Sequence, residues 1–155
     1  MQMELIGKVH IVPLVFPQDV TTTGPTFDIV GLKKWNHVTI LVMTGTNSKG
    51  CTLTLEECDD VTPTNDTAIA FNYRKMETSD VWGALTAATS SGVTIADDDD
   101  NCVYAIELDA AELSDGYAYV IPKLSNPASG NNYFAAIAIL SEPRFAEDVP
   151  STVIT

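Results

Sequence analysis

Short runs in which apolar and polar residues alternate, separated by turn-forming residues, are the feature of this sequence that most restricts its fold. A period of two places successive side chains on opposite faces of a β-strand, whereas a helix requires a period of about 3.6. In residues 51–56, for example, Leu53 and Leu55 share one face while Thr52 and Thr54 share the other. Because this pattern recurs along the chain, it predicts an all-β fold.

Two runs are apolar on both faces. Residues 37–44 are apolar at both parities from Ile40 to Met43, which predicts a central strand that is covered on both sides. The unbroken apolar run 133–140 has the periodicity of either a buried helix or a buried strand, but its short length and the turn residues around it favour a strand. Residues 46–50 predict a hairpin turn between the first of these strands and the strand at 51–56.

The rest of the chain continues the pattern. Further strands are predicted at four places: 68–74, 92–96, 102–109 and 117–121. The stretch 57–66 predicts a loop, and residues 110–113 predict one helical turn that Asp109 caps and Gly116 ends. About eight strands with this spacing predict a jelly-roll-like β-sandwich, folded as a single domain over residues 1–155.

The two ends of the chain differ from its middle. Residues 1–17 are apolar and contain Pro13 and Pro17, which predicts a strand followed by an extended arm. Residues 143–155 contain Pro150 and several β-branched residues, but no alternation long enough for a strand. We expect extended segments at both ends, which lie across a neighbouring subunit or, equally well, against their own domain.

The charge of the chain restricts its partners. With 21 acidic and 8 basic residues the formal net charge is −13, and apart from the pairs Lys33-Lys34 and Arg74-Lys75 the basic residues are scattered. Binding to nucleic acid or to an anionic membrane requires clustered Lys and Arg, so both are disfavoured. No signal peptide is recognisable and no stretch approaches about 18 apolar residues, so we expect a soluble protein made in the cytoplasm.

The three cysteines, Cys51, Cys58 and Cys102, cannot all pair with one another and do not have the spacing of a zinc site. We expect reduced, mostly buried thiols. A Cys51–Cys58 disulfide is the alternative, because both residues flank one predicted strand.

No catalytic machinery is recognisable, and we predict no catalytic, cofactor-binding or metal-binding residues. The two histidines, His10 and His37, have no second histidine at metal-ligand spacing, and His37 opens a buried strand, which favours a structural role. The G-x-S-x-G motif, the Walker loop and the G-x-G-x-x-G motif are absent. Two of the 21 acidic residues could converge as a glycosidase pair, but nothing selects a pair.

Two acidic segments are candidates for calcium binding. Residues 97–101 read Asp-Asp-Asp-Asp-Asn and lie between two predicted strands, and residues 56–60 form a second patch. Calcium prefers such oxygen ligands, but the glycine and distal glutamate of an EF-hand loop are missing. We therefore predict a solvated turn in both places.

The aromatic residues allow a sugar-binding platform or a packed core. Four of the five tyrosines lie on predicted strands at inward parity, which favours the core. The residues concerned are Trp35, Trp82, Tyr73, Tyr104, Tyr117, Tyr119 and Tyr133.

Beyond these patterns, the sequence from about Trp35 onward resembles a group of small virion proteins of tailed bacteriophages, several of which are capsid decoration, or cement, proteins. The segments that carry the resemblance are 36–42, 94–101, 105–113, 138–146 and 150–155. Residues 1–34 match this group weakly.

The resemblance implies a non-enzymatic β-sandwich subunit, a homotrimer, that binds the major capsid protein on the outside of the phage head and stabilises the shell. A carbohydrate-binding or adhesin module on a phage head or tail is the alternative.

Overall fold

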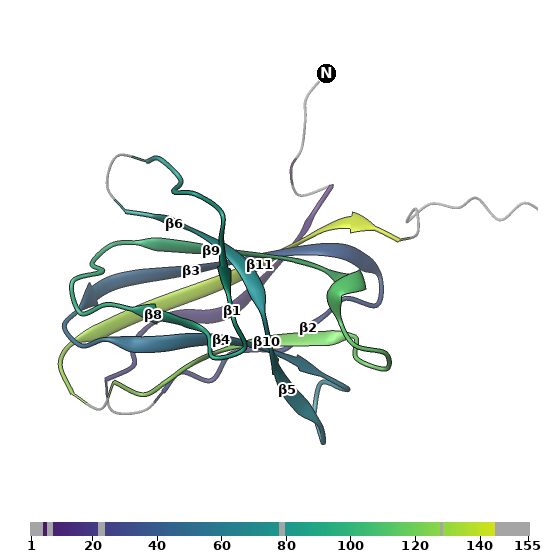
Figure 1. Cartoon of the computed structure of the whole chain (residues 1–155), viewed down its shortest axis with the longest axis horizontal. Coiled ribbons are helices and arrows are strands. Elements are labelled where there is room, and N and C mark those ends of the chain that lie inside the picture. The colour runs from purple at the N-terminus through teal and green to yellow at the C-terminus, as the bar shows by residue number, and fades with distance from the viewer. Residues whose placement is uncertain (1–4, 6–7, 22–23, 78–79, 128, 145–155) are drawn as a thin grey trace, which may run out of the picture.

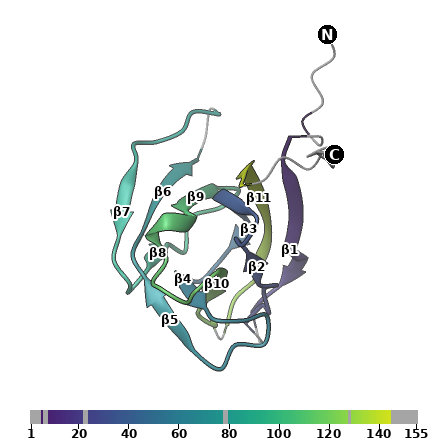
Figure 2. The ribbon, with the colours of Figure 1, turned by 90° about the vertical axis from the view of Figure 1, so that its right-hand side faces the viewer.

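The computed structural model describes residues 5, 8–21, 24–77, 80–127 and 129–144. It confirms the predicted β-sandwich, in which two antiparallel sheets enclose one core (Figures 1 and 2). The six-stranded sheet runs in the order β1 (His10–Asp19), β11 (Asn132–Pro143), β3 (Trp35–Asn47), β9 (Val103–Asp109), β6 (Phe71–Met76) and β7 (Thr86–Ala88). The five-stranded sheet runs β2 (Val30–Gly31), β10 (Tyr119–Leu124) and β4 (Cys51–Cys58), and both β5 (Asp66–Ile69) and β8 (Val93–Ile95) pair with β4.

Alternating side chains of the central strands form the core. Along β3, Val38, Ile40 and Val42 are fully buried, and β9 contributes Tyr104 and Ile106 from the adjacent strand. The apolar run 133–140 lies within β11 and is a strand, as predicted. The predicted helical turn is the 3-10 helix η1 (Ala110–Glu112), which is too short to cross a membrane and is the one helix in the described part of the chain.

The turn after β3 is not the predicted hairpin. β3 belongs to the six-stranded sheet and β4 to the five-stranded sheet, so residues 48–50 carry the chain from one sheet to the other. A turn sequence fixes a change of direction but not the strand that will be paired, because pairing depends on contacts that are distant in sequence. The segments between β8 and β9 and between β10 and β11 also cross between the sheets.

These three crossings lie together at one end of the sandwich and are held by two asparagines. Asn47, which is fully buried, donates its side-chain amide to the carbonyl of Ala96 in the second crossing. The buried Asn132 accepts a hydrogen bond from the backbone of Lys49 at 3.1 Å and donates one to the carbonyl of Ser129 at 3.1 Å. Buried amides that bond backbone groups in this way fix the three turns relative to one another.

The alternating run 68–74 is not one strand. It breaks at Ala70, so that Ile69 ends β5 in one sheet and Phe71 begins β6 in the other. Both strands are extended and alternate, which is why the sequence does not reveal the crossing.

The N-terminal segment also differs from its prediction. The predicted arm is part of the strand: β1 starts at His10, runs to Asp19 and contains both Pro13 and Pro17. Proline fits here because β1 is an edge strand with register irregularities after Pro13 and after Val15. At the other end β11 extends to Pro143, and residues 145–155 of the predicted tail lie outside the described residues.

Candidate functional site

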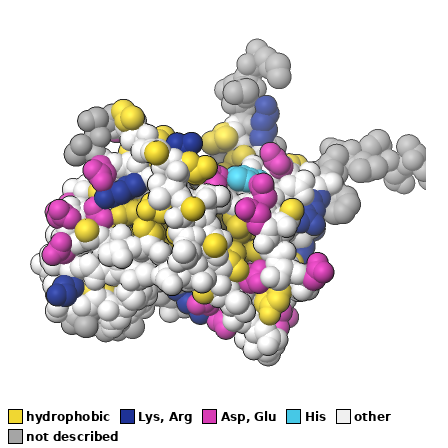
Figure 3. Space-filling model, viewed as in Figure 1, with side chains coloured by type: hydrophobic (Ala, Val, Ile, Leu, Met, Phe, Trp, Pro, Cys, Tyr) yellow, Lys and Arg dark blue, Asp and Glu magenta, His cyan; other side chains and the backbone are white. Residues whose placement is uncertain are grey.

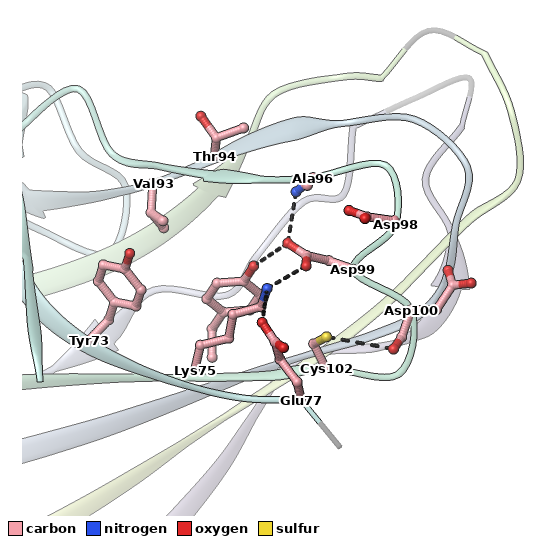
Figure 4. A pocket seen from close by; sticks show the side chains of 11 residues that line it. Tyr73, Lys75, Glu77, Val93, Thr94, Ala96, Asp98, Asp99, Asp100 and Cys102 are labelled. Atoms are coloured by element: carbon pink, nitrogen blue, oxygen red, sulfur yellow. Dashed lines mark hydrogen bonds and ion pairs between the residues drawn. The ribbon is translucent and has the colours of Figure 1, made fainter. Parts of the chain in front are cut away.

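A hollow of about 520 Å³ opens between the two sheets, beside the acidic turn that joins β8 to β9 (Figure 4). One wall is β6, where Tyr73 and Lys75 lie opposite Ile106 and Tyr104 of β9 and therefore point toward the interior of the sandwich. The other walls are β8 and the acidic turn. The larger sheet continues past β9 with β6 and β7, whereas the smaller sheet ends on the same side at β5 and β8. The two additional strands are therefore not fully covered, and this leaves the hollow.

Asp99 is the centre of this site. Its carboxylate pairs with the ammonium group of Lys75 and accepts hydrogen bonds from the hydroxyl of Tyr104 at 2.6 Å and from the backbone N–H of Ala96 at 2.8 Å (Figure 4). Lys75 also pairs with Glu77 at 2.6 Å. The prediction of a solvated turn is wrong for Asp99, because this residue is only 8% exposed. Lys75, which the sequence shows only as half of a basic pair, supplies the charge that permits this burial.

The network shifts the titration of its members. Burial raises the pKa of Asp99, but the bonds from Lys75, Tyr104 and Ala96 outweigh burial and hold the pKa below its ordinary value. Burial and the neighbouring Asp99 carboxylate raise the pKa of Tyr104 far above its ordinary value. For Lys75 the carboxylates of Asp99 and Glu77 overcome the effect of burial and raise the pKa. The site is therefore a fixed set of charges at neutral pH.

The other aspartates of the turn do not join the network of Asp99, Lys75 and Tyr104. Asp97 and Asp98 are exposed, while Asp100 accepts a hydrogen bond from the backbone N–H of Asn47 at 2.6 Å and its carboxylate points away from Lys75 (Figure 4). Within the described ranges no group of three or more His, Cys, Asp or Glu side chains is arranged to hold a metal ion. Successive residues of a turn face different directions, which explains why four adjacent aspartates do not form one ligand set.

The second acidic segment is also not a simple solvated turn. Glu57 is only 3% exposed and accepts a hydrogen bond from the backbone N–H of Ser114 at 2.8 Å, and Glu56 pairs with Lys123. Asp59 accepts hydrogen bonds from Asn65 and Thr64, and these bonds lower its pKa to about 2. These acids organise the turn between β4 and β5 and the start of the segment after η1.

His37 is held between two carboxylates on the outer face of the larger sheet. Its Nε2 lies 2.7 Å from Glu107 and its Nδ1 lies 2.6 Å from Asp109. Burial lowers the pKa of His37, but hydrogen bonds to Asp109 and Glu107 outweigh burial and raise it. The other histidine, His10, stacks on Trp35 with ring centroids 6.2 Å apart.

All three cysteines are free and buried. The alternative Cys51–Cys58 disulfide is wrong, because the two residues lie at opposite ends of the eight-residue strand β4. At about 3.3 Å per residue they are separated by far more than the ~7 Å that a disulfide can bridge. Burial raises the pKa of Cys51 to about 11.

The aromatic residues do not all pack in the core. Tyr104 is 1% exposed, whereas Tyr133 is 47% exposed because it lies on the opposite face of β11 from the buried Phe134. Trp82 is 41% exposed, in the loop between β6 and β7. Core packing, which the sequence favoured for the aromatic residues as a group, is therefore found for Tyr104 and not for Tyr133 or Trp82.

No protein-family model matches the chain, and no curated protein matches it. A chain from the solved "Structure of infectious bursal disease virus Gx strain" aligns at 10% sequence identity with a TM-score of 0.22, over 88% of this chain and 42% of that chain. This chain therefore spans less than half the length of that viral chain.

Proposed function

We propose that this protein is a non-enzymatic component of a tailed-bacteriophage head: a capsid decoration, or cement, protein that binds the outside of the major capsid lattice as a homotrimer. It is made in the host cytoplasm and ends up on the exterior of the virion. In this role it stabilises the shell through many modest contacts that act together around a closed lattice.

The order of the strands supports this proposal. The chain forms four antiparallel pairs, β1 with β11, β2 with β10, β3 with β9, and β4 with β8. If β5, β6 and β7 are regarded as an insertion, these four pairs are those of one long hairpin that is rolled up into two sheets. This is the topology of a jelly roll, and we infer that fold. Jelly rolls occur in viral capsid domains and in lectins, so the fold agrees with the proposal without selecting it.

The observation that carries the proposal is the position of the two chain ends. His10 at the start of β1 pairs with Leu140 near the end of β11, so the first described strand begins beside the end of the last one, at one edge of the sandwich (Figure 2). Segments attached at one edge can engage the same neighbouring subunit, and apolar residues in them would add contact area at about 25 cal/mol per Å² before ordering costs.

The proposal is tested by co-sedimentation of the purified protein with expanded shells of the major capsid protein from the same genome, together with native mass spectrometry. We expect a trimer that binds the shells, and a truncation after Arg144 that stays folded by circular dichroism but loses binding or trimerisation. Failure of the full chain to bind the shells, or a genome without a major capsid protein, would overturn the proposal. Normal decoration by the truncated chain would overturn the role of the tail.

The second candidate is a carbohydrate-binding or adhesin module, and the exposure of Trp82 favours it. An exposed indole beside a polar hollow can stack on a sugar ring. Trp35 is less available, because it stacks on His10. Glycan-array binding that is lost in Trp82→Ala would support this candidate in place of the first.

A further inference from the structure

The inner face of β6 is open to solvent at Tyr73 and Lys75, beyond the buried Phe71, in the described part of the chain. A second hollow, of about 440 Å³, adjoins the hollow beside the acidic turn and shares Tyr73, Lys75 and Glu77 with it. Tyr73 and Lys75 occupy the inward side of β6, the side that packs against the opposite sheet elsewhere in a sandwich, and Glu77 follows the end of the strand. The larger sheet thus has an uncovered flank between the acidic turn and the loop that follows β6.

The rim of this flank is apolar and held in place. Val81 is 68% exposed and lines the second hollow, and the adjacent Trp82 is 41% exposed. Their loop is fixed to β6, because the N–H of Gly83 bonds the carbonyl of Lys75 at 2.8 Å and Arg74 bonds the carbonyl of Gly83 at 2.9 Å. Large apolar side chains that are kept exposed in this way are typical of an interaction surface.

The floor of the flank is acidic. One ammonium group and four carboxylates line the hollow beside the acidic turn, which gives a formal charge of −3. The single cation, Lys75, is already paired with Asp99 and Glu77. Asp98 is exposed; its backbone carbonyl accepts a hydrogen bond from the N–H of Asp100 at 2.9 Å, while its carboxylate is not bonded to any side chain or backbone group of the described residues. Figure 3 shows acidic side chains gathered at this end of the sandwich, close to exposed hydrophobic ones.

We infer that the uncovered flank binds a segment of a partner protein in which a lysine or arginine is flanked by apolar residues. The cation would enter the hollow beside Asp98 and Glu77, and the apolar neighbours would cover Val81 and Trp82. The negative charge disfavours nucleic acid and other anionic partners. The inference rests on the proposed function, in which the partner segment belongs to the major capsid protein.

Matched substitutions test this inference. Asp98→Lys reverses a charge that faces the hollow, whereas Asp97→Lys makes the same change at an exposed neighbour that does not line it. Val81→Ser removes an apolar side chain from the rim, whereas Val61→Ser does so at a comparably exposed position, 60% against 68%, in the turn between β4 and β5.

The measurement is the affinity of each folded variant for expanded shells of the major capsid protein from the same genome, in co-sedimentation. We expect Asp98→Lys and Val81→Ser each to weaken binding by roughly tenfold or more, and the two controls to stay within about twofold of wild type. Wild-type affinity in both test variants would overturn the inference and leave the proposed function standing. No binding by the wild-type chain would overturn both. Glycan binding that requires Trp82 but is unchanged in Asp98→Lys would replace the inference with a sugar site.

Discussion

The hydroxyl of Tyr104, a side chain of the hydrophobic core that also lines the hollow, donates a 2.6 Å hydrogen bond to the carboxylate of Asp99. The bond joins the crossing between the sheets to β9, while Lys75 brings the third partner from β6. Removing one member of such a buried network leaves the other members without partners, which costs more than the bond itself contributes.

Asp99→Asn tests the stability that this network provides. The substitution leaves Lys75 without its most buried counter-charge, and we expect the free energy of unfolding to fall by about 2–4 kcal/mol. Asp97→Asn, in the same turn but exposed, should change it by less than about 0.5 kcal/mol. Urea denaturation of both variants is the measurement, and equal stability of the two would show that the network contributes nothing.

Gly92 and Gly116 form a second matched pair. Both have a positive φ, +83° and +92°, so an alanine is strained at either position. At Gly92 the added Cβ would also overlap the carbonyl oxygen of Leu53 in β4, whereas at Gly116 it meets nothing within 4 Å.

We therefore expect Gly116→Ala to cost about 1 kcal/mol and Gly92→Ala to cost at least about 2 kcal/mol more, because the short strand β8 must then move away from β4. The measurement is thermal or urea unfolding of the two variants. A Gly92→Ala protein as stable as Gly116→Ala would contradict the close approach of β8 to β4.

The buried thiols predict a slow reaction with a thiol reagent. None of the three cysteines should be labelled in the native protein at pH 8, since the thiolate is the reactive form and burial raises the pKa of each. All three should react after unfolding without a reductant. Labelling counted by intact mass is the measurement, and one unreactive pair in the unfolded chain would indicate a disulfide.

Strands were easier to predict from this sequence than their partners. The positions of β4 and β9 follow from alternation, because one face of each is covered by the core, and those of β3 and β11 follow from short apolar runs. The crossing at Ala70 and the turn after β3 were not predictable, since an extended segment has the same local pattern in either sheet. Which sheet it joins depends on residues far along the chain.

The candidate site shows the same limit at the level of side chains. In sequence the four aspartates 97–100 are equivalent, and Asp99 differs from the others only because Lys75 and Tyr104 face it in the folded chain. The inward parity of Lys75, two residues after Tyr73 and four after the buried Phe71, was the available signal that a buried carboxylate must lie nearby.

His37 makes stability depend on pH in a defined direction. Glu107 and Asp109 on β9 accept hydrogen bonds from its protonated ring. Arg74 of β6 and Glu112 of η1 line a hollow on the outer face of the larger sheet that His37 also lines. The folded-state pKa is raised, so this contribution to stability is complete below the unfolded-state pKa of about 6.5 and is lost as the pH rises through the folded-state pKa.

We therefore expect the free energy of unfolding to decrease between about pH 6 and about pH 9, by about 1 kcal/mol or less because the two carboxylates are partly exposed and screened. In His37→Gln this decrease should be absent. The measurement is urea unfolding at both pH values for the two proteins. An equal decrease in the variant would assign the pH dependence to another group, and an increase in the wild type would contradict the raised pKa.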